Sequence, residues 1–276
     1  NTDEPMPTRY TDITTDGGTL VSGGGDFTSA AGAAIATGGG DVILTGHSGA
    51  VTVNDTIDTT GGAGGQIRIS GSSISLNDNI DPVVLNSGGA VLLRTPAIDI
   101  QGDVTGPSVT VSDPGGNGIG LGAAVAVGPN ISGAELQRVT TPILAFDTAG
   151  SVTVDGVSAA NSQNADSVTL DAGNQILFVN NSASFQALIV QADNGIAVNA
   201  DVATLAGNLS LDGDADGAVD GNDSISFADG VLVSSAGSLT LEAANGGMTG
   251  AGTLVLGAAH GAALDRSHSG PPAGGR

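Results

Sequence analysis

Short aliphatic runs alternate with polar residues along most of the chain, and Gly, Asn, Asp, Ser or Thr interrupts each run after a few positions. Val51 and Val53 flank Thr52, for example, and Ile98 and Ile100 flank a single Asp. Strict alternation sends successive side chains to opposite faces of an extended strand, and the interrupting residues are turn formers. The pattern predicts many short strands, each with one apolar face, joined by tight turns.

The predicted strands recur with a fixed period. In the first half, three sets of apolar positions step together by 23 to 25 residues: Val42, Ile67 and Val91; Val51, Ile74 and Ile98; Ile57, Ile80 and Val104. In the second half, pairs of positions step by 20 and 21 residues: Val168 and Leu170, Leu188 and Val190, Leu209 and Leu211. Three short strands in such a unit describe one coil of a solenoid, which buries its inward face only when the next coil stacks about 4.8 Å away. We therefore predict an all-β fold, a parallel β-helix with about 18–25 residues per coil. An antiparallel sandwich is the alternative, but it predicts no sustained period.

One step in the second half is too long. Leu239 and Leu241 follow Leu209 and Leu211 by 30 residues, and removing the 12 residues 212–223 leaves 18, close to one coil. The segment 212–223 is therefore predicted to be an insertion that projects from a corner of the solenoid.

A helix signal divides the two halves. Ser132 is placed to cap a helical turn over residues 134–139, which Pro142 would end. The apolar pattern is missing at both ends of the chain, where we expect flexible segments. The predicted organisation is a flexible segment 1–16, a first block of coils 17–131, a helical turn 132–142, a second block of coils 143–262 and a disordered tail 263–276.

Composition and charge narrow the function. The 276 residues include 46 Gly and 2% aromatics, so the core must consist of Val, Ile, Leu and Ala. The net charge of −22, from 28 acidic residues and only six Arg, repels phosphate backbones and argues against nucleic-acid binding. No apolar run approaches the roughly 20 residues of a membrane span, so no membrane insertion is expected. Without cysteine the chain has no thiol nucleophile and no thiolate metal site.

The insertion reads LDGDADGAVDGND and matches the ligand spacing of a calcium loop, with Gly217 at its sharp turn. Five carboxylates within twelve residues repel one another unless a cation neutralises them. Two features depart from the pattern, because Asp replaces the usual final Glu and strands replace the flanking helices. A solvated acidic turn is the alternative. We predict a structural Ca²⁺ site whose ligands are Asp212, Asp214, Asp216, the Ala218 carbonyl, Asp220 and Asp223.

Other candidate chemistry is weaker. GGAGGQIRI is similar to a glycine-rich calcium nonapeptide, but Gln66 stands where Asp is needed and the unit is not repeated. Asp78 and Asp81 form a carboxylate pair that could serve a glycosidase, although polar turn residues explain them more simply. The histidines have no zinc-ligand spacing: His47, His260 and His268.

The segments AELQRVTTPILAFDTAGSVTVDGVSA and GIAVNADVATLAGNLSLDGDADGAVDGNDSISFADGVLVSSAGSLTLEA resemble the repeats of filamentous haemagglutinin-like exoproteins. VTVNDTIDTTGGAGG is similar to the same repeats, and the resemblance covers roughly residues 38–257. It implies a right-handed β-helix within a long bacterial secreted or cell-surface protein. It also implies two-partner secretion through an outer-membrane transporter, and adhesion to a carbohydrate or protein on a host or neighbouring cell. The secretion domain of that family is not evident here. The chain opens on Asn without a visible signal peptide, so we expect a fragment of a longer protein.

Together these features predict a non-catalytic structural or adhesive rod with a calcium-stabilised loop. The alternative is a polysaccharide-active β-helix enzyme, a lyase or hydrolase. Such enzymes need basic residues to hold an acidic substrate, and here Lys is absent and the few Arg are dispersed. An ice-binding solenoid would require stacked Thr-x-Thr rows, whereas the outward positions mix Thr, Ser, Asp and Arg.

Overall fold

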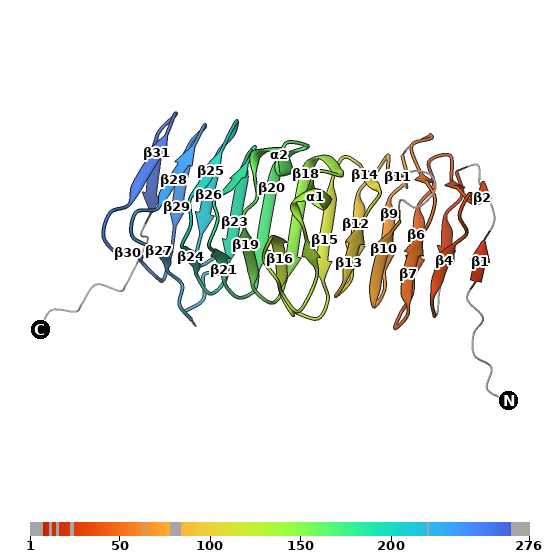
Figure 1. Ribbon diagram of the computed structural model, residues 1–276, viewed down its shortest axis with the longest axis horizontal. Coiled ribbons are helices and arrows are strands. Elements are labelled where there is room, and N and C mark those ends of the chain that lie inside the picture. Colours follow the sequence, from red (N-terminus) through yellow and green to blue (C-terminus); the bar gives the residue numbers. More distant parts are fainter. Residues whose placement is uncertain are drawn as a thin grey trace, which may run out of the picture.

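The computed structural model describes residues 8–10, 13–14, 17–22, 25–62, 64–77, 84–219 and 221–265. These residues form a rod of stacked coils, with β1 (Thr8–Tyr10) and β31 (Val255–Ala258) at opposite ends of the long axis (Figure 1). Each strand pair within the described part of the chain is parallel, and each strand pairs with its counterpart in the next coil, as in β7 (Ala50–Val53) and β10 (Ser73–Leu76). The predicted parallel β-helix is confirmed.

The strands stack into faces that run along the rod. One face begins with a five-stranded sheet of β1, β4 (Phe27–Ser29), β7, β10 and β13 (Ile98–Ile100). It is followed by a seven-stranded sheet of β17 (Asn130–Ile131), β16 (Ile119–Gly122), β19 (Val152–Asp155), β21 (Ile176–Phe178), β24 (Ile196–Val198), β27 (Ile225–Phe227) and β30 (Met248–Gly250). A second face contains β2 (Ile13–Thr14), β5 (Ile35–Ala36), β8 (Ile57–Asp58), β11 (Val84–Asn86) and β14 (Asp103–Thr105), and later the four-stranded sheet of β22 (Ala183–Phe185), β25 (Val202–Thr204), β28 (Leu232–Ser235) and β31.

The third face runs the length of the rod, and we call it the long ladder. Its strands, in order, are β3 (Leu20–Ser22), β6 (Val42–Thr45), β9 (Ile67–Ser70), β12 (Val91–Arg94), β15 (Val109–Asp113), β18 (Val139–Thr148), β20 (Ala165–Ala172), β23 (Leu188–Ala192), β26 (Leu209–Asp212), β29 (Leu239–Glu242) and β32 (Ala262–Asp265). Strand β18 also pairs with β14 and so joins the long ladder to the second face.

The predicted register is confirmed at most anchor positions. Val42 pairs with Ile67 and Ile67 with Val91, and Val51, Ile74 and Ile98 align in the same way. In the second half, Leu209 pairs with Leu239 although 30 residues separate them, so the segment between them is an insertion, as expected. One anchor was wrong: Leu85 pairs with Ile57 and with Val104, in the place predicted for Ile80, a residue outside the described part of the chain. The turn before Leu85 is longer than a constant step allows.

The core consists of the inward positions of these strands. Val, Ile and Leu side chains supply most of it, and the largest fully buried side chains also include Phe146, Phe178 and Phe185. Each coil contributes a layer, and each layer packs against the layers above and below it. Burial is therefore continuous along the rod and requires no central aromatic cluster.

Stacked glycines explain part of the unusual composition. A Cβ atom on Gly65 would collide with the carbonyl of Gly40, and one on Gly40 would collide with the carbonyl of Gly18. At these corners successive coils approach so closely that only hydrogen fits, and a side chain would force the coils apart.

Two short helices interrupt the strands in mid-rod. The predicted helix is α1 (Gly133–Leu136), and Ser132 caps it through a capping box with Glu135. It ends earlier than expected, and Pro142 lies within β18 because that strand begins at Val139.

A second helix, α2 (Ala159–Ser162), was not predicted. Ser158 caps it through Asn161, whose Nδ2 also donates to the Gly133 carbonyl at 3.0 Å and joins α2 to α1. The two helices therefore belong to stacked coils. Asn at the third helical position is a weaker capping signal than Glu, which explains why α2 was missed.

The chain ends also differ from expectation. Strands β1 and β2 lie within the segment 1–16 that was predicted to be flexible, and β32 extends to Asp265, inside the predicted tail 263–276. The remaining residues of both segments lie outside the described part of the chain. At each end the strands pair with the neighbouring coil, which turn-rich sequence alone does not indicate.

Candidate cation-binding loop

The acidic insertion leaves the rod between β26 and β27 and returns to it without disturbing the stack (Figure 1). Its first residues are tied to both neighbouring coils, because Gly213 N donates to the Glu242 carbonyl at 2.9 Å and Ala215 N donates to the Ala192 carbonyl at 3.1 Å. On the return side, Ile225 resumes the register by pairing with Ile196. The insertion is therefore a corner loop, as predicted.

The base of the loop buries two carboxylates. Asp214 is 3% exposed and Asp223 is 4% exposed. Both lie beside the same segment of the next coil: Asn245 N donates to Asp214 Oδ2 at 2.5 Å, and Gly246 lies against the Asp223 carbonyl. A Cβ atom built on Gly213 lies 3.3 Å from the Ser224 carbonyl carbon, so the two limbs of the loop are adjacent at this level.

One oxygen of each buried carboxylate has no partner. Within the described residues, neither Asp214 Oδ1 nor Asp223 Oδ1 has a hydrogen-bond donor. A buried carboxylate oxygen without a donor or a counter-charge is costly, typically by about 1–3 kcal/mol or more. The loop base thus presents two anionic oxygens whose chemistry fits a hard cation.

The other predicted ligands have ordinary roles in the loop. Asp212 Oδ1 accepts a hydrogen bond from Asp214 N at 3.1 Å, and Asp216 Oδ1 accepts one from Ala218 N at 2.9 Å. Burial, with the nearby charge of Asp214, raises the pKa of Asp212, although the bond from Asp214 N opposes this rise. Gly217 has a φ of 65°, in the left-handed region that the predicted sharp turn requires.

Asn245 is the residue that sequence reasoning missed. Its backbone N binds Asp214, and its side-chain Nδ2 donates to the Gly217 carbonyl at 2.9 Å, so it clamps both the base and the tip of the loop. It lies one coil downstream, just after β29. Only the register of β26 with β29 connects it to the loop, and no local motif indicates it.

The predicted ligands are not assembled into one complete shell. Among the residues that the structure describes, no three acidic or histidine side chains are grouped so as to hold a metal ion. Asp214 and Asp223 meet at the loop base, Asp216 is exposed at the tip, and Asp220 lies outside the described residues. The carboxylate pair Asp78 and Asp81 also lies outside them.

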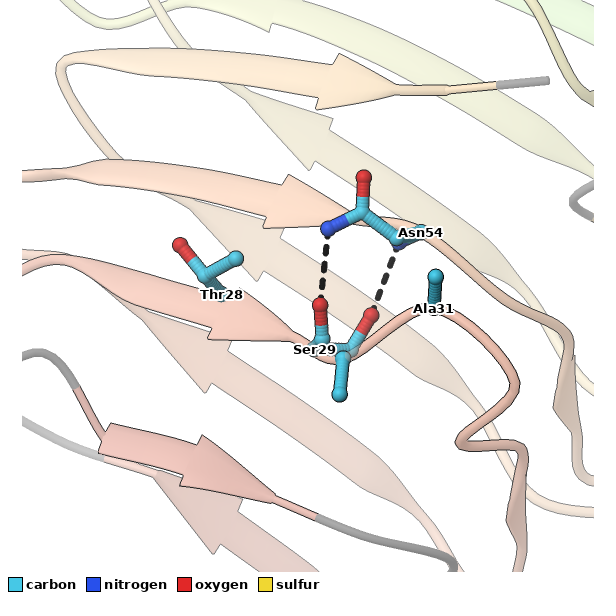
Figure 2. A pocket seen from close by; sticks show the side chains of 5 residues that line it. Thr28, Ser29, Ala31 and Asn54 are labelled. Carbon is cyan, nitrogen blue, oxygen red and sulfur yellow. Dashed lines mark hydrogen bonds between the residues drawn. The ribbon is translucent and has the colours of Figure 1, made fainter. Parts of the chain in front are cut away.

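A shallow depression of about 250 Å³ lies at a corner of the first coils, between Thr28, Ser29, Ala31 and Asn54 (Figure 2). Asn54 N donates to Ser29 Oγ and Asn54 Nδ2 donates to the Ser29 carbonyl, each at 2.7 Å. In the next coil Asn77 Nδ2 donates to Asn54 Oδ1 at 2.8 Å. The lining contains no titratable side chain, and its polar groups are used in holding adjacent coils together.

No family model, curated protein or solved structure matches the chain. The resemblance to filamentous haemagglutinin-like repeats therefore rests on the sequence alone. In the part of the chain that the structure describes, no helix has the length and apolar character needed to cross a membrane.

Proposed function

We propose that this chain is a structural or adhesive rod segment of a large bacterial secreted or cell-surface protein, without catalytic activity of its own. The stacked coils support the proposal, because a solenoid with an uninterrupted aliphatic core extends in one direction and separates what lies at its two ends. Within the longer protein, the rod would hold a binding region away from the cell surface. It would also display its own outer faces to carbohydrate or protein on a host or neighbouring cell.

The route to the surface follows from the resemblance. A filamentous haemagglutinin-like protein would pass through an outer-membrane transporter by two-partner secretion. The absence of cysteine fits such export, because the unfolded chain cannot be trapped by a disulfide in an oxidising compartment.

The acidic loop is the candidate for a structural Ca²⁺ site. The observation that carries this proposal is the pair of buried, unpartnered oxygens, Asp214 Oδ1 and Asp223 Oδ1. Calcium accepts carboxylate and carbonyl oxygens in flexible geometry, so the remaining predicted ligands would complete its coordination. When bound, the ion would supply positive charge at the loop base and so fix the loop on its two neighbouring coils.

Thermal unfolding in Ca²⁺ and in EDTA tests the site. A cation that binds only the folded chain adds about 2.7 kcal/mol at a concentration 100-fold above its Kd, or roughly 5–10 °C in Tm for a domain of this size. We expect such a rise for the parent chain. Asp223→Asn should abolish the rise and should also increase Tm in EDTA, because it removes an uncompensated buried charge.

Asp99→Asn provides the matched control, since Asp99 is an exposed acidic residue on β13 and far from the loop in the coil order. This variant should keep the full response to Ca²⁺. Equal Tm values for the parent chain in Ca²⁺ and EDTA would refute the site and leave the loop as an acidic turn, with the rod proposal intact.

A further inference from the structure

The outer face of the long ladder carries two columns of side chains in register. The first column is Ile43, Arg68, Leu92, Thr110, Ala145, Thr169, Ile189, Ser210, Thr240 and Ala263. The second is Thr45, Ser70, Arg94, Ser112, Asp147, Asp171, Gln191, Asp212, Glu242 and Asp265. We call this surface the long face. Its charge changes sign along the rod.

The end of the long face nearer the N-terminus, its basic end, carries two arginines. Arg68 on β9 and Arg94 on β12 are both exposed, and Arg68 pairs in register with Leu92, two residues from Arg94. Neither guanidinium has a hydrogen bond or ion pair with another described residue, although the chain contains 28 acidic residues. A depression of about 220 Å³ separates them, with Ile43 and Leu92 in its lining and no acidic side chain.

The other end of the long face, its acidic end, is a column of carboxylates. Asp147 and Asp171 occupy consecutive coils, as do Asp212 and Glu242, and Asp265 continues the column. Burial, together with the charge of Asp147, raises the pKa of Asp171, so the carboxylates already repel one another. Only Gln191 interrupts the series.

The two ends have the same pitch. Arg68 and Arg94 lie on consecutive strands and are therefore about 4.8 Å apart along the rod axis, which is also the spacing of successive carboxylates in the acidic column. We propose that the long face binds a second copy of this chain, with the basic end of one copy against the acidic end of the next. The contact goes beyond the rod proposal and does not depend on calcium.

The arrangement of charges favours a staggered contact over a closed dimer. Strand β18 lies at the middle of the long ladder, so an antiparallel two-fold pairing would place Asp147 against Asp147 of the other copy. A staggered overlap avoids this repulsion and leaves one basic and one acidic end free, so it continues as an open string. Because the net charge of −22 opposes association, the contact depends on local ion pairs and weakens as salt screens them.

Sedimentation velocity in EDTA tests the proposal with two charge-reversed variants. The basic-end variant is Arg68→Glu with Arg94→Glu, and the acidic-end variant is Asp171→Lys with Glu242→Lys. We expect the parent chain to form oligomers that grow with concentration at about 0.02 M salt and dissociate at about 0.5 M. Each variant alone should remain a 26.4 kDa monomer. A 1:1 mixture of the two should assemble again, because each end then meets its opposite charge.

Arg138→Glu is the control, since Arg138 faces Asp103 at 3.9 Å and belongs to neither column. It should assemble like the parent chain, and circular dichroism should show that every variant keeps the β-helix. A parent chain that stays monomeric at every salt and protein concentration overturns the proposal. A mixture that fails to assemble does so too, and neither result affects the Tm test of the calcium site.

Discussion

Carboxylates of this acidic chain differ in how the fold treats their charge. Asp155 accepts hydrogen bonds from Asn180 Nδ2 at 2.9 Å and from Asn181 Nδ2 at 2.8 Å. These bonds, led by the one from Asn180, hold the pKa of Asp155 below its usual range. Burial, and then the charge of Asp147, raises the pKa of Asp171. The folded state therefore favours the charged form of Asp155 and disfavours that of Asp171.

Asn substitutions at these two positions should have opposite effects. A lowered pKa stabilises the fold above the unfolded pKa, near 3.8, and this stabilisation is lost as the pH falls through the folded value. A raised pKa has the reverse effect: the penalty is present at neutral pH and disappears as the pH falls below the ordinary range. At pH 7, Asp155→Asn should lower Tm, whereas Asp171→Asn should raise stability by up to about 0.5 kcal/mol. Thermal scans from pH 7 to 3 should show both differences shrinking, and two differences of the same sign would contradict this account.

Elements built on repetition were predictable, and those built on contacts between coils were not. The strands containing Leu188 and Leu209 follow directly from alternation and period, and their register matches the prediction. The position of the acidic loop follows from the same count. Helix α2 and the partner pairing at Leu85 were missed, because a weak capping signal and a longer turn break the simple step. Asn245 was missed because its two hydrogen bonds to the loop depend on which coil lies above it.

Neighbouring residues of β23 provide a direct test of which face is buried. Leu188 is fully buried, whereas Ile189 is 42% exposed on the long face. Leu188→Ala should cost about 2–5 kcal/mol, because it removes a core side chain and leaves a cavity between coils. Ile189→Ala should change stability by less than about 0.5 kcal/mol. Urea unfolding followed by circular dichroism measures both values. Similar losses for the two variants would mean that the register of this strand is shifted by one residue.

Along the whole molecule, stability is the sum of similar contacts between neighbouring coils. Each layer touches only the layers next to it, so no residue of the first coils supports the last ones directly. The last coil differs because it is covered on one side only. Met248, Leu256 and Leu264 there line an apolar depression of about 190 Å³, and Leu264 is 58% exposed. Loss of this coil should therefore be tolerated.

Two truncations should separate the last coil from the coil that holds the acidic loop. A chain ending at Gly247 lacks β30, β31 and β32 but keeps Asn245, which clamps the loop base. It should retain a β-rich spectrum and the rise of Tm in Ca²⁺, because the remaining coils keep all their neighbours. A chain ending at Ala236 also lacks β29 and Asn245, so Asp214 loses its partner and the response to Ca²⁺ should be reduced or lost. Circular dichroism melts of both chains in Ca²⁺ and EDTA provide the comparison. Complete unfolding of the longer truncated chain would show instead that the rod folds as one cooperative unit that the last coil completes.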